Sequence, residues 1–201
     1  MAAAAALESV HAIQRNDSLV DLSAQQLVDC DTGNAGCRGG FAFKAFNYII
    51  SNGGLASEAA YPYRGWRDTC QAAANSPLVA MAGFNRVAAF LEFDLMFAVK
   101  FVPVVVAVDG SDDSFKNYAG GVYRGPCGHS LNHEMLLVGY GTTDDWDYDY
   151  WIVKNSYGEG WGENGYMRMQ RNINRDTEDS LGMCGILLDS IYPYMEWIDY
   201  P

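Results

Sequence analysis

The sequence predicts an α+β fold in which helices fill the first half of the chain and strands fill the second. Apolar side chains recur at helical spacing over residues 2–15, 24–30, 41–51 and 92–101. From residue 104 on, β-branched or alternating runs at 104–108, 134–140, 150–153, 166–171 and 185–188 are typical of strands. Because helices and strands are segregated along the chain, we expect two lobes with a cleft between them rather than an alternating βαβ sheet.

Composition excludes several classes of protein. The chain has 201 residues, of which 49% are hydrophobic and 19% charged, which is enough to bury a core and too apolar for a disordered chain. The net charge is −12, from 13 basic and 25 acidic residues, and no basic cluster is present. This charge argues against a nucleic acid or an anionic membrane surface as partner. No run reaches the ~18 apolar residues of a transmembrane helix.

The helices have recognisable boundaries. The first begins in alanines, the best helix formers, and places Leu7, Val10 and Ile13 on one face. Ser23-Ala-Gln-Gln26 is a capping box for the second helix. Asn52-Gly53-Gly54 ends the third, and Pro103 stops the fourth, which we expect over Glu92–Phe101.

Two polar residues stand at the ends of predicted strands. His133 opens the strand at 134–140, and Asn155 follows the strand at 150–153. A strand end can direct an imidazole into a cleft, and an asparagine can hold that imidazole in one tautomer. A turn residue and a structural histidine are the alternatives. His11, on a helix, is expected at the surface or at its boundary with the core, and His129, in a glycine-rich turn, is expected to be exposed.

Patterns that can indicate a nucleotide or metal site occur here without the flanking sequence that such a site requires. Residues 160–165 spell G-x-G-x-x-G, but a strand pattern follows where a dinucleotide site needs a helix. The five cysteines contain no C-x-x-C pair, and the acidic run at 144–149 has no calcium-loop pattern. The sequence therefore predicts no cofactor and no metal. The sequon Asn16-Asp17-Ser18 has meaning only in a secreted chain.

Several motifs in order resemble the papain-like cysteine peptidases, in particular plant members. They lie at Leu22–Asp31, Gly36–Gly40, Tyr61–Tyr63, Gly120–Gly128, Leu131–His133 and Tyr150–Ser156. The resemblance implies a papain-like fold: a helical lobe at residues 1–84, a β-barrel-like lobe at 85–190, and a segment at 191–201, with Tyr192, Tyr194 and Trp197, that packs back across both.

The resemblance also implies roles for site residues. His133 is the general base and acid, and Asn155 orients it. The family's nucleophile belongs to a Cys-Gly-x-Cys-Trp segment roughly 130–150 residues before the histidine, and no such segment occurs in this sequence. The family's oxyanion-hole glutamine, further upstream, is also absent. We therefore expect an N-terminally truncated copy without peptidase activity and with reduced stability.

The five cysteines are accounted for by the same resemblance. It pairs Cys30 with Cys70 and Cys127 with Cys184. Cys37 would pair with a cysteine of the missing segment, so we expect it as a free thiol.

Substrate contacts follow from the resemblance as well. Gly39 and Gly40 would pair with a peptide backbone, and Asn132 belongs to the same binding set. Phe41, Ala42, Ala107, Leu131 and Glu134 would line the pocket for the side chain two positions before the scissile bond. Glu134 departs from the small residue usual there; whether it narrows the pocket or admits a basic side chain stays open. Tyr157, in place of the usual Trp, and Trp161 would shield the His–Asn hydrogen bond from water.

Three functions are compatible with these expectations. The first is an incomplete cysteine endopeptidase, the second a non-catalytic module that binds peptides or a cystatin-like inhibitor, and the third a non-functional fragment. We expect a monomer without nucleic-acid or membrane partners. The family works in vacuoles, lysosomes or outside the cell, and two disulfides fit an oxidising compartment; the sequence shows no signal peptide.

Overall fold

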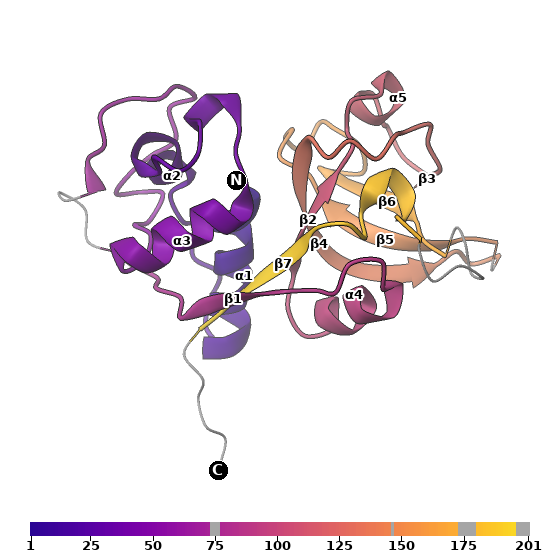
Figure 1. Cartoon of the computed structure of the whole chain (residues 1–201), viewed down its shortest axis with the longest axis horizontal. Coiled ribbons are helices and arrows are strands. Elements are labelled where there is room, and N and C mark those ends of the chain that lie inside the picture. The colour runs from indigo at the N-terminus through magenta and orange to yellow at the C-terminus, as the bar shows by residue number, and fades with distance from the viewer. Residues whose placement is uncertain (73–76, 146, 173–179, 196–201) are drawn as a thin grey trace, which may run out of the picture. The chain divides into compact units, whose positions relative to one another are not determined.

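The computed structural model describes residues 1–72, 77–145, 147–172 and 180–195. The chain divides into two compact units (Figure 1). Unit 1 contains Met1, Ala3–Asn85 and the described part of the chain from Pro193 on, and unit 2 contains Ala2 and Arg86–Tyr192. The order of elements is α-helical first and strand-rich second, as the sequence predicts.

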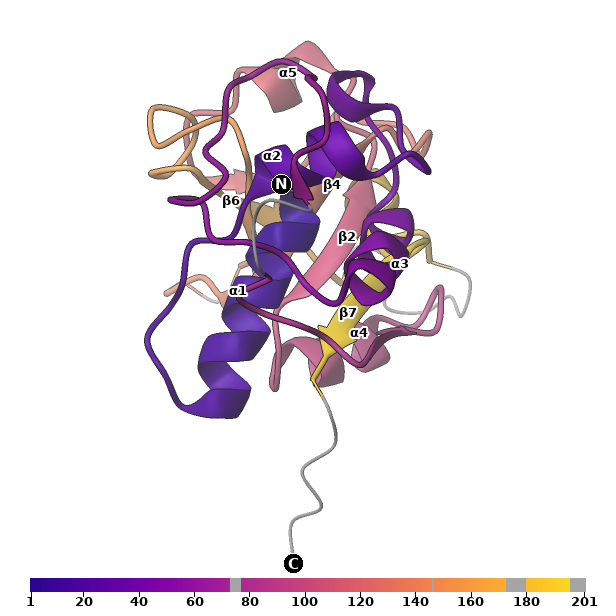
Figure 2. The same cartoon turned by 90° about the vertical axis from the view of Figure 1, so that its left-hand side faces the viewer.

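Unit 1 is built on helices, which lie toward the viewer in Figure 2. They are α1 (Ala2–Arg15), α2 (Ala24–Cys30), the short 3₁₀ helix η1 (Gly36–Arg38) and α3 (Ala42–Asn52), followed by strand β1 (Gly83–Arg86). α1 buries Leu7 and Val10, and α3 buries Phe46 and Ile49. The expected caps are present in part, because Ser23 accepts the backbone N–H of Gln26 and Gly53 closes α3 in the left-handed conformation. The Gln26 side chain accepts from the backbone of Ala56, so the capping box is not reciprocal.

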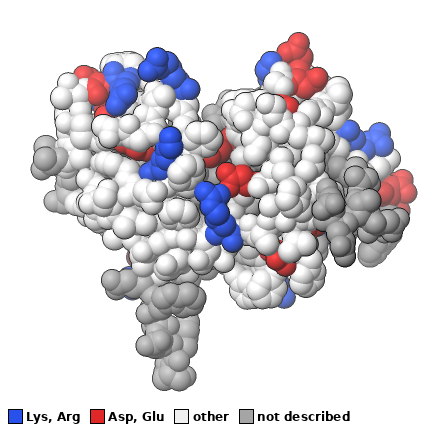
Figure 3. Space-filling model, in the orientation of Figure 1, with Lys and Arg blue, Asp and Glu red and all other residues white. Residues whose placement is uncertain are grey.

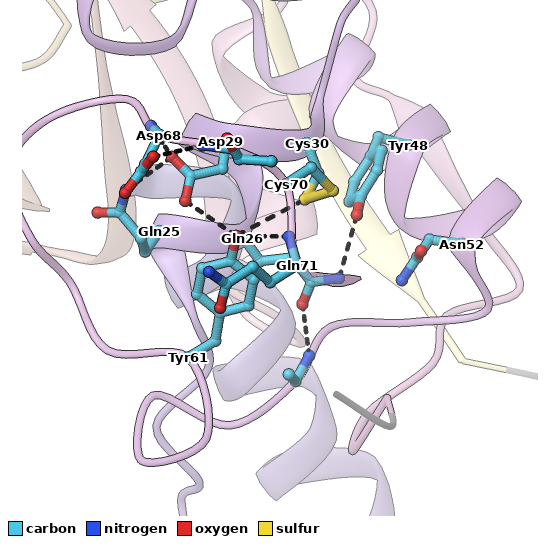
Figure 4. Close-up of a disulfide and its surroundings, with 12 residues drawn as sticks. Gln25, Gln26, Asp29, Cys30, Tyr48, Asn52, Tyr61, Asp68, Cys70 and Gln71 are labelled. Atoms are coloured by element: carbon cyan, nitrogen blue, oxygen red, sulfur yellow. Dashed lines mark hydrogen bonds between the residues drawn. A yellow bond between two sulfur atoms is a disulfide. The ribbon is translucent and has the colours of Figure 1, made fainter. Parts of the chain in front are cut away.

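A network of buried polar side chains holds α2 to the loop that follows α3 (Figure 4). At its centre the Asp29 carboxylate accepts hydrogen bonds from Gln25, Tyr61, the Arg64 guanidinium and the backbone N–H of Asp68. Burial raises the pKa of Asp29, but these hydrogen bonds outweigh it and leave the pKa below its ordinary value. The disulfide Cys30–Cys70 lies beside this network.

Unit 2 is built on a sheet. Its elements are α4 (Glu92–Val99), β2 (Val104–Val108), α5 (Asp113–Lys116), β3 (Val122–Tyr123), β4 (His133–Thr142), β5 (Asp149–Lys154), β6 (Tyr166–Gln170), η3 (Met183–Gly185) and β7 (Ser190–Tyr194), of which Pro193 and Tyr194 belong to unit 1. The strand order is β1-β7-β2-β4-β5-β6-β3. β3 is parallel to β6. The pairs β2–β7, β2–β4, β4–β5 and β5–β6 are antiparallel. The sheet has two edge strands, β1 and β3, so it is open where the sequence predicted a barrel-like lobe.

The core of unit 2 lies on the buried face of this sheet. Val104, Val106 and Val108 of β2 belong to the same buried cluster as Trp151 of β5 and Met167 and Met169 of β6. α4 adds Leu95 and Val99 to the same core. β2 is buried at every position, which explains why its sequence is a continuous apolar run.

One predicted strand is wrong. Residues 185–188 form the end of η3 and a turn, with Cys184 and Gly185 in the left-handed region at φ 53° and 80°. Ile186 and Leu187 are buried there without strand pairing, so their apolar character reflects core packing. The strand lies a few residues later, at β7. Trp197 lies outside the described residues, and the packing of residues 191–201 across the lobes stays a prediction.

Candidate active site

His133 is placed by the centre of the unit 2 sheet. It is the first residue of β4, which pairs antiparallel with β2 so that His133 lies opposite Val108 and Glu134 opposite Ala107. β5 pairs with the other side of β4. An antiparallel pair brings the start of one strand beside the end of the other, and therefore Asn155, just after β5, lies near His133.

The two side chains are joined by a hydrogen bond. His133 Nε2 lies 2.8 Å from Asn155 Oδ1. The same oxygen accepts the backbone N–H of Ser156 at 2.8 Å, and a backbone N–H is always a donor, so the atom facing the ring is the amide oxygen. Nε2 must therefore carry the hydrogen, and Nδ1 holds the lone pair that can accept a proton.

Aromatic rings surround this pair. The Tyr157 ring lies 5.1 Å from the His133 ring, tilted by 31°, and Phe115 meets His133 edge-on at 6.2 Å. Trp161 contacts Tyr157 edge-on at 5.6 Å and is fixed by its indole N–H, which donates to the carbonyl of Lys116. Trp161 is buried whereas Tyr157 is 48% exposed, so Tyr157 forms the solvent-facing cover.

Burial lowers the pKa of His133 below its ordinary value of 6.5, and the hydrogen bond to Asn155 partly opposes that shift. The lowered pKa favours the neutral imidazole, and the hydrogen bond to Asn155 leaves its lone pair on Nδ1. A neutral, oriented imidazole can take a proton from an acidic group and return it to a leaving group, which is general base and general acid chemistry.

A buried carboxylate organises the loops beside His133. Asp109, directly after β2, accepts hydrogen bonds from the backbone and hydroxyl of Ser111, from the backbone of Ser130 and from the Asn132 amide. The hydroxyl and the backbone N–H of Ser111 do most to hold the pKa of Asp109 at about 2. Sequence reasoning missed Asp109 and Phe115. A lone acidic residue between a buried strand and a glycine was the available signal for Asp109.

The predicted substrate residues of unit 2 surround the start of β4. Ala107 and Glu134 are direct cross-strand partners, and Ala107 is buried while Glu134 and Leu131 are half-buried. The Asn132 side chain is committed to the loops, because its oxygen accepts from Gly110 and its amide donates to Asp109 and to the Ser130 carbonyl.

The predicted substrate residues of unit 1 lie between η1 and α3. Gly39 is exposed at φ 98°, with open space where a Cβ would stand. At Gly40 a Cβ would stand 2.2 Å from Asn34 Oδ1, so this glycine is needed for packing. Phe41 is 52% exposed, and Ala42 is buried in unit 1 with 2% of its surface exposed.

The cysteines occupy three places. Cys30 is bonded to Cys70 in unit 1, and Cys127 to Cys184 in unit 2. Cys37 forms no disulfide and is exposed on η1, with its sulfur 3.8 Å from the Gly65 carbonyl oxygen. Within the described residues, no group of three or more acidic, histidine or cysteine side chains is placed to hold a metal ion. The described helices include none that could span a membrane.

Comparison with known families matches this architecture. Residues 1–194 match the family described as papain family cysteine protease. The cysteine endopeptidase Rep1 of Oryza sativa subsp. japonica is 48% identical over 190 residues, which are 93% of this chain and 50% of the relative. Zingipain-2 of Zingiber officinale is 45% identical over 189 residues, covering 94% of this chain and 82% of the relative. The chain thus spans half the length of the rice relative.

Solved structures agree in fold. The bromelain protease from Ananas comosus in complex with the E64 inhibitor superposes with a TM-score of 0.90 at 45% identity, covering 97% of this chain and 87% of that one. The proform of Amb a 11, a ragweed pollen allergen and cysteine protease, gives 0.91 at 41% identity, covering 100% and 53%.

Proposed function

Because the chain belongs to the papain family of cysteine proteases, we propose that His133 and Asn155 are the general base and its orienting amide for peptide-bond hydrolysis, and that residues 1–201 alone do not hydrolyse peptides. The observation that carries the first part is the 2.8 Å bond between His133 Nε2 and Asn155 Oδ1, which leaves Nδ1 as the proton acceptor.

In a papain-type reaction His133 Nδ1 takes the proton of a cysteine thiol. The thiolate attacks the peptide carbonyl carbon, and the proton on Nδ1 passes to the departing amine, which leaves an acyl-enzyme thioester. Water, deprotonated by the same imidazole, then hydrolyses the thioester and releases the acid. Asn155 keeps the ring in one tautomer, and Tyr157 with Trp161 shields the bond between them.

The second part of the proposal rests on the cysteines. Four of the five are in disulfides, and a disulfide sulfur is no thiolate. Cys37 is on a short 3₁₀ helix and not at the N-terminus of an α-helix, where the helix dipole stabilises a thiolate. The first turn of α1 consists of alanines after Met1, which offer no nucleophile.

Turnover of a fluorogenic peptide by the purified 201-residue chain tests this directly, and we expect none above background. A second protein carries an added N-terminal segment with the Cys-Gly-x-Cys-Trp motif. We expect it to gain turnover that His133→Ala lowers by about 10⁴-fold or more, as loss of a member of a catalytic triad does. Turnover by the unextended chain that a thiol-directed inhibitor blocks would contradict the proposal, as would an extended chain indifferent to His133→Ala.

A non-catalytic binding function is the second candidate, favoured by the geometry around Gly39 and Gly40. The backbone groups of Gly40 form no hydrogen bond among the described residues, and the space over Gly39 is open. An extended peptide can pair with such groups. Selection of the bound side chain by Phe41, Ala42, Ala107, Leu131 and Glu134 stays a prediction from the family resemblance, and a cystatin-like inhibitor is the expected protein partner. Fluorescence anisotropy with peptides bearing leucine or arginine two positions before the cleavage point decides the preference; Glu134→Ala should weaken only an arginine peptide.

Two disulfides also support an oxidising compartment, the vacuole or lysosome or the cell exterior. Thiol counting on the denatured, unreduced 201-residue chain checks the two disulfides, and we expect one free group, from Cys37.

A further inference from the structure

An exposed sequon follows α1 directly, in unit 1. Asn16, Asp17 and Ser18 form the tripeptide Asn-x-Ser with a residue other than proline in the middle, which is the acceptor signal for an N-linked glycan. No second tripeptide of this kind occurs in the 201 residues of the sequence. Because an N-linked glycan is bulky and hydrophilic, its asparagine must stand at the surface of the folded protein. The place of Asn16 in the fold therefore decides whether this sequon can be used.

The Asn16 side chain is free to carry a large substituent. Asn16 is exposed, as are Asp17, Ser18 and Leu19 after it. Among the described residues nothing forms a hydrogen bond with the Asn16 side chain, and the Ser18 hydroxyl contacts only the neighbouring Asp17 carboxylate, at 3.4 Å. A glycan on the amide nitrogen of Asn16 therefore displaces no contact of the fold.

The segment that carries the sequon is held at its two ends. The backbone N–H of Asp17 donates to the Ala12 carbonyl at 3.2 Å, and that of Leu22 donates to the Glu8 carboxylate at 2.8 Å. Between these points the chain loops outward from the end of α1 before it reaches α2 (Figure 2). The sequon thus lies on a surface loop, which is where a glycan acceptor is found in secreted proteins.

Helix capping is a second explanation for the asparagine. Asn16 ends α1 in the left-handed conformation, at φ 50° and ψ 45°, and its backbone N–H donates to the Ala12 carbonyl. Asparagine adopts this conformation more readily than most other residues, so capping alone accounts for Asn16. Capping sets no requirement on the residue two positions later, however, and it is Ser18 that makes the tripeptide an acceptor. Substitutions can therefore separate the two explanations.

The disulfides support the compartment that glycan transfer needs. Cys30–Cys70 and Cys127–Cys184 are bonds of the kind that form in the lumen of the endoplasmic reticulum. N-linked glycans are attached in the same lumen. Two independent features of the chain, its cysteine pairing and its sequon, therefore point to one route through the cell.

We propose that Asn16 is the acceptor of one N-linked glycan, attached as the chain passes through that lumen; the proposal rests on the oxidising compartment proposed above. The donor is an oligosaccharide carried on a lipid diphosphate. The amide nitrogen of Asn16 attacks C1 of the first sugar, a bond forms between that nitrogen and C1, and the bond from C1 to the phosphate oxygen breaks. The nitrogen loses one proton, the lipid diphosphate departs, and nothing is oxidised or reduced.

The glycan covers apolar surface at this end of α1. Ile13, one turn before Asn16, is 52% exposed, and Leu19, three residues after it, is 61% exposed. Figure 3 shows a face of unit 1, on the left, on which uncharged side chains predominate. Sugar hydroxyls anchored between Ile13 and Leu19 keep this surface in contact with water, so we expect the glycosylated chain to aggregate more slowly than the bare chain.

The glycan lies far from the first turn of α1, to which the added Cys-Gly-x-Cys-Trp segment described above is joined. α1 has 14 residues, so its two ends are about 20 Å apart. We therefore expect the glycan to leave the peptide turnover of the extended protein unchanged.

Translation of the full chain behind a cleavable secretory leader, in the presence of microsomes, tests the acceptor. We expect one shift to lower electrophoretic mobility that endoglycosidase H reverses. Asn16→Gly should abolish the shift while it keeps the cap, because glycine also adopts the left-handed conformation. Ser18→Ala should abolish the shift although Asn16 is present, and Ser18→Thr, the matched control, should keep it.

Mass spectrometry locates the sugar. Endoglycosidase H leaves one N-acetylglucosamine on the asparagine, and we expect it on the tryptic peptide of residues 16–38, which begins after Arg15. A shift that persists in Ser18→Ala, or a sugar on another peptide, would contradict the proposal.

Entry into the lumen is measured separately. Ala119→Ser creates a second sequon, which begins at Asn117 on an exposed part of unit 2, and we expect this variant to show two shifts. If it shows one shift that Asn16→Gly leaves in place, the lumen is reached without use of Asn16 and the proposal is overturned. Thiol counting on the same sample distinguishes the compartment from the glycan: one free thiol without any sugar on Asn16 overturns the glycan while the two disulfides stand.

Discussion

The polar network around Asp29 in unit 1 and the His133–Asn155 pair in unit 2 differ in how completely their buried groups are hydrogen-bonded. Elsewhere each unit has one further buried side-chain atom without a partner among the described residues, His11 Nδ1 in unit 1 and Arg171 Nε in unit 2. The five buried polar residues of unit 1 all have their hydrogen bonds satisfied within it: Ser23, Gln25, Gln26, Asp29 and Asp31. In unit 2 the buried amide of Asn155 accepts two hydrogen bonds through its oxygen, but its nitrogen has no partner. The lone pair on His133 Nδ1 is likewise not bound by any described residue.

This difference distinguishes polar groups that stabilise the fold from polar groups that are available for binding or catalysis. A fully satisfied network fixes one conformation and has no capacity left for a ligand. A site must keep donors or acceptors for its substrate, and that costs stability. By this criterion Asp29 is structural although it is a buried carboxylate, and the His133–Asn155 pair is the place for chemistry.

The largest effect on the free energy of unfolding is expected for the polar network around Asp29. Asp29→Ala should lower the free energy of unfolding by about 3–5 kcal/mol, because the Tyr61 hydroxyl, one N–H of the Gln25 amide and the Arg64 guanidinium lose the acceptor that Asp29 provides. Asn155→Ala should cost only about 1 kcal/mol, since a half-satisfied group loses less. The two losses of stability can be compared by amide hydrogen exchange, measured in α2 for Asp29→Ala and in β4 for Asn155→Ala. Equal losses would mean that both networks are structural.

A smaller effect distinguishes the two glycines next to η1. Gly40→Ala should cost about 2 kcal/mol, because its Cβ displaces the Asn34 side chain, which holds Asp31 and the backbone of Phe41. Gly39→Ala should cost about 1 kcal/mol, from its φ of 98° alone. Thermal melting measures both, and Asn34→Gly should remove most of the additional cost at Gly40. Additive losses in the Asn34→Gly/Gly40→Ala variant would contradict the steric account.

Sequence predicts most of this fold because its signals are local. α1 is expected and found over Ala2–Arg15, and β2 over Val104–Val108, since alanine propensity and a β-branched run need no distant partner. β1, β3 and β7 were missed because pairing with distant strands defines these short segments. Residues 185–188 were misassigned because apolar residues in a buried turn have the composition of a strand.

The candidate site, too, is predicted by the sequence only in part. His133 and Asn155 stand at strand ends that the sequence marks, whereas their partners are set by tertiary structure. Phe115 reaches His133 from α5, and Asp109 accepts hydrogen bonds from Ser111 and from Ser130, which lies 21 residues after Asp109 in the sequence.

The smallest effect is the most specific to the site in unit 2. By NMR titration, His133 should have a pKa below 6.5 because its ring is buried. Asn155→Ala should lower that pKa further by removing the hydrogen bond that favours the charged form, whereas Tyr157→Ala should move it back toward 6.5 by exposing the ring to water. A folded-state pKa below the unfolded value means that the folded protein binds fewer protons, so the contribution to stability is present above pH 6.5 and is lost as pH falls below it. Both substitutions leave His11 and His129 as reference signals. Shifts of the His133 pKa in the same direction for Asn155→Ala and Tyr157→Ala would show that burial and the hydrogen bond do not act separately on this ring. The His133–Asn155 pair would then not differ in kind from the fully hydrogen-bonded network around Asp29.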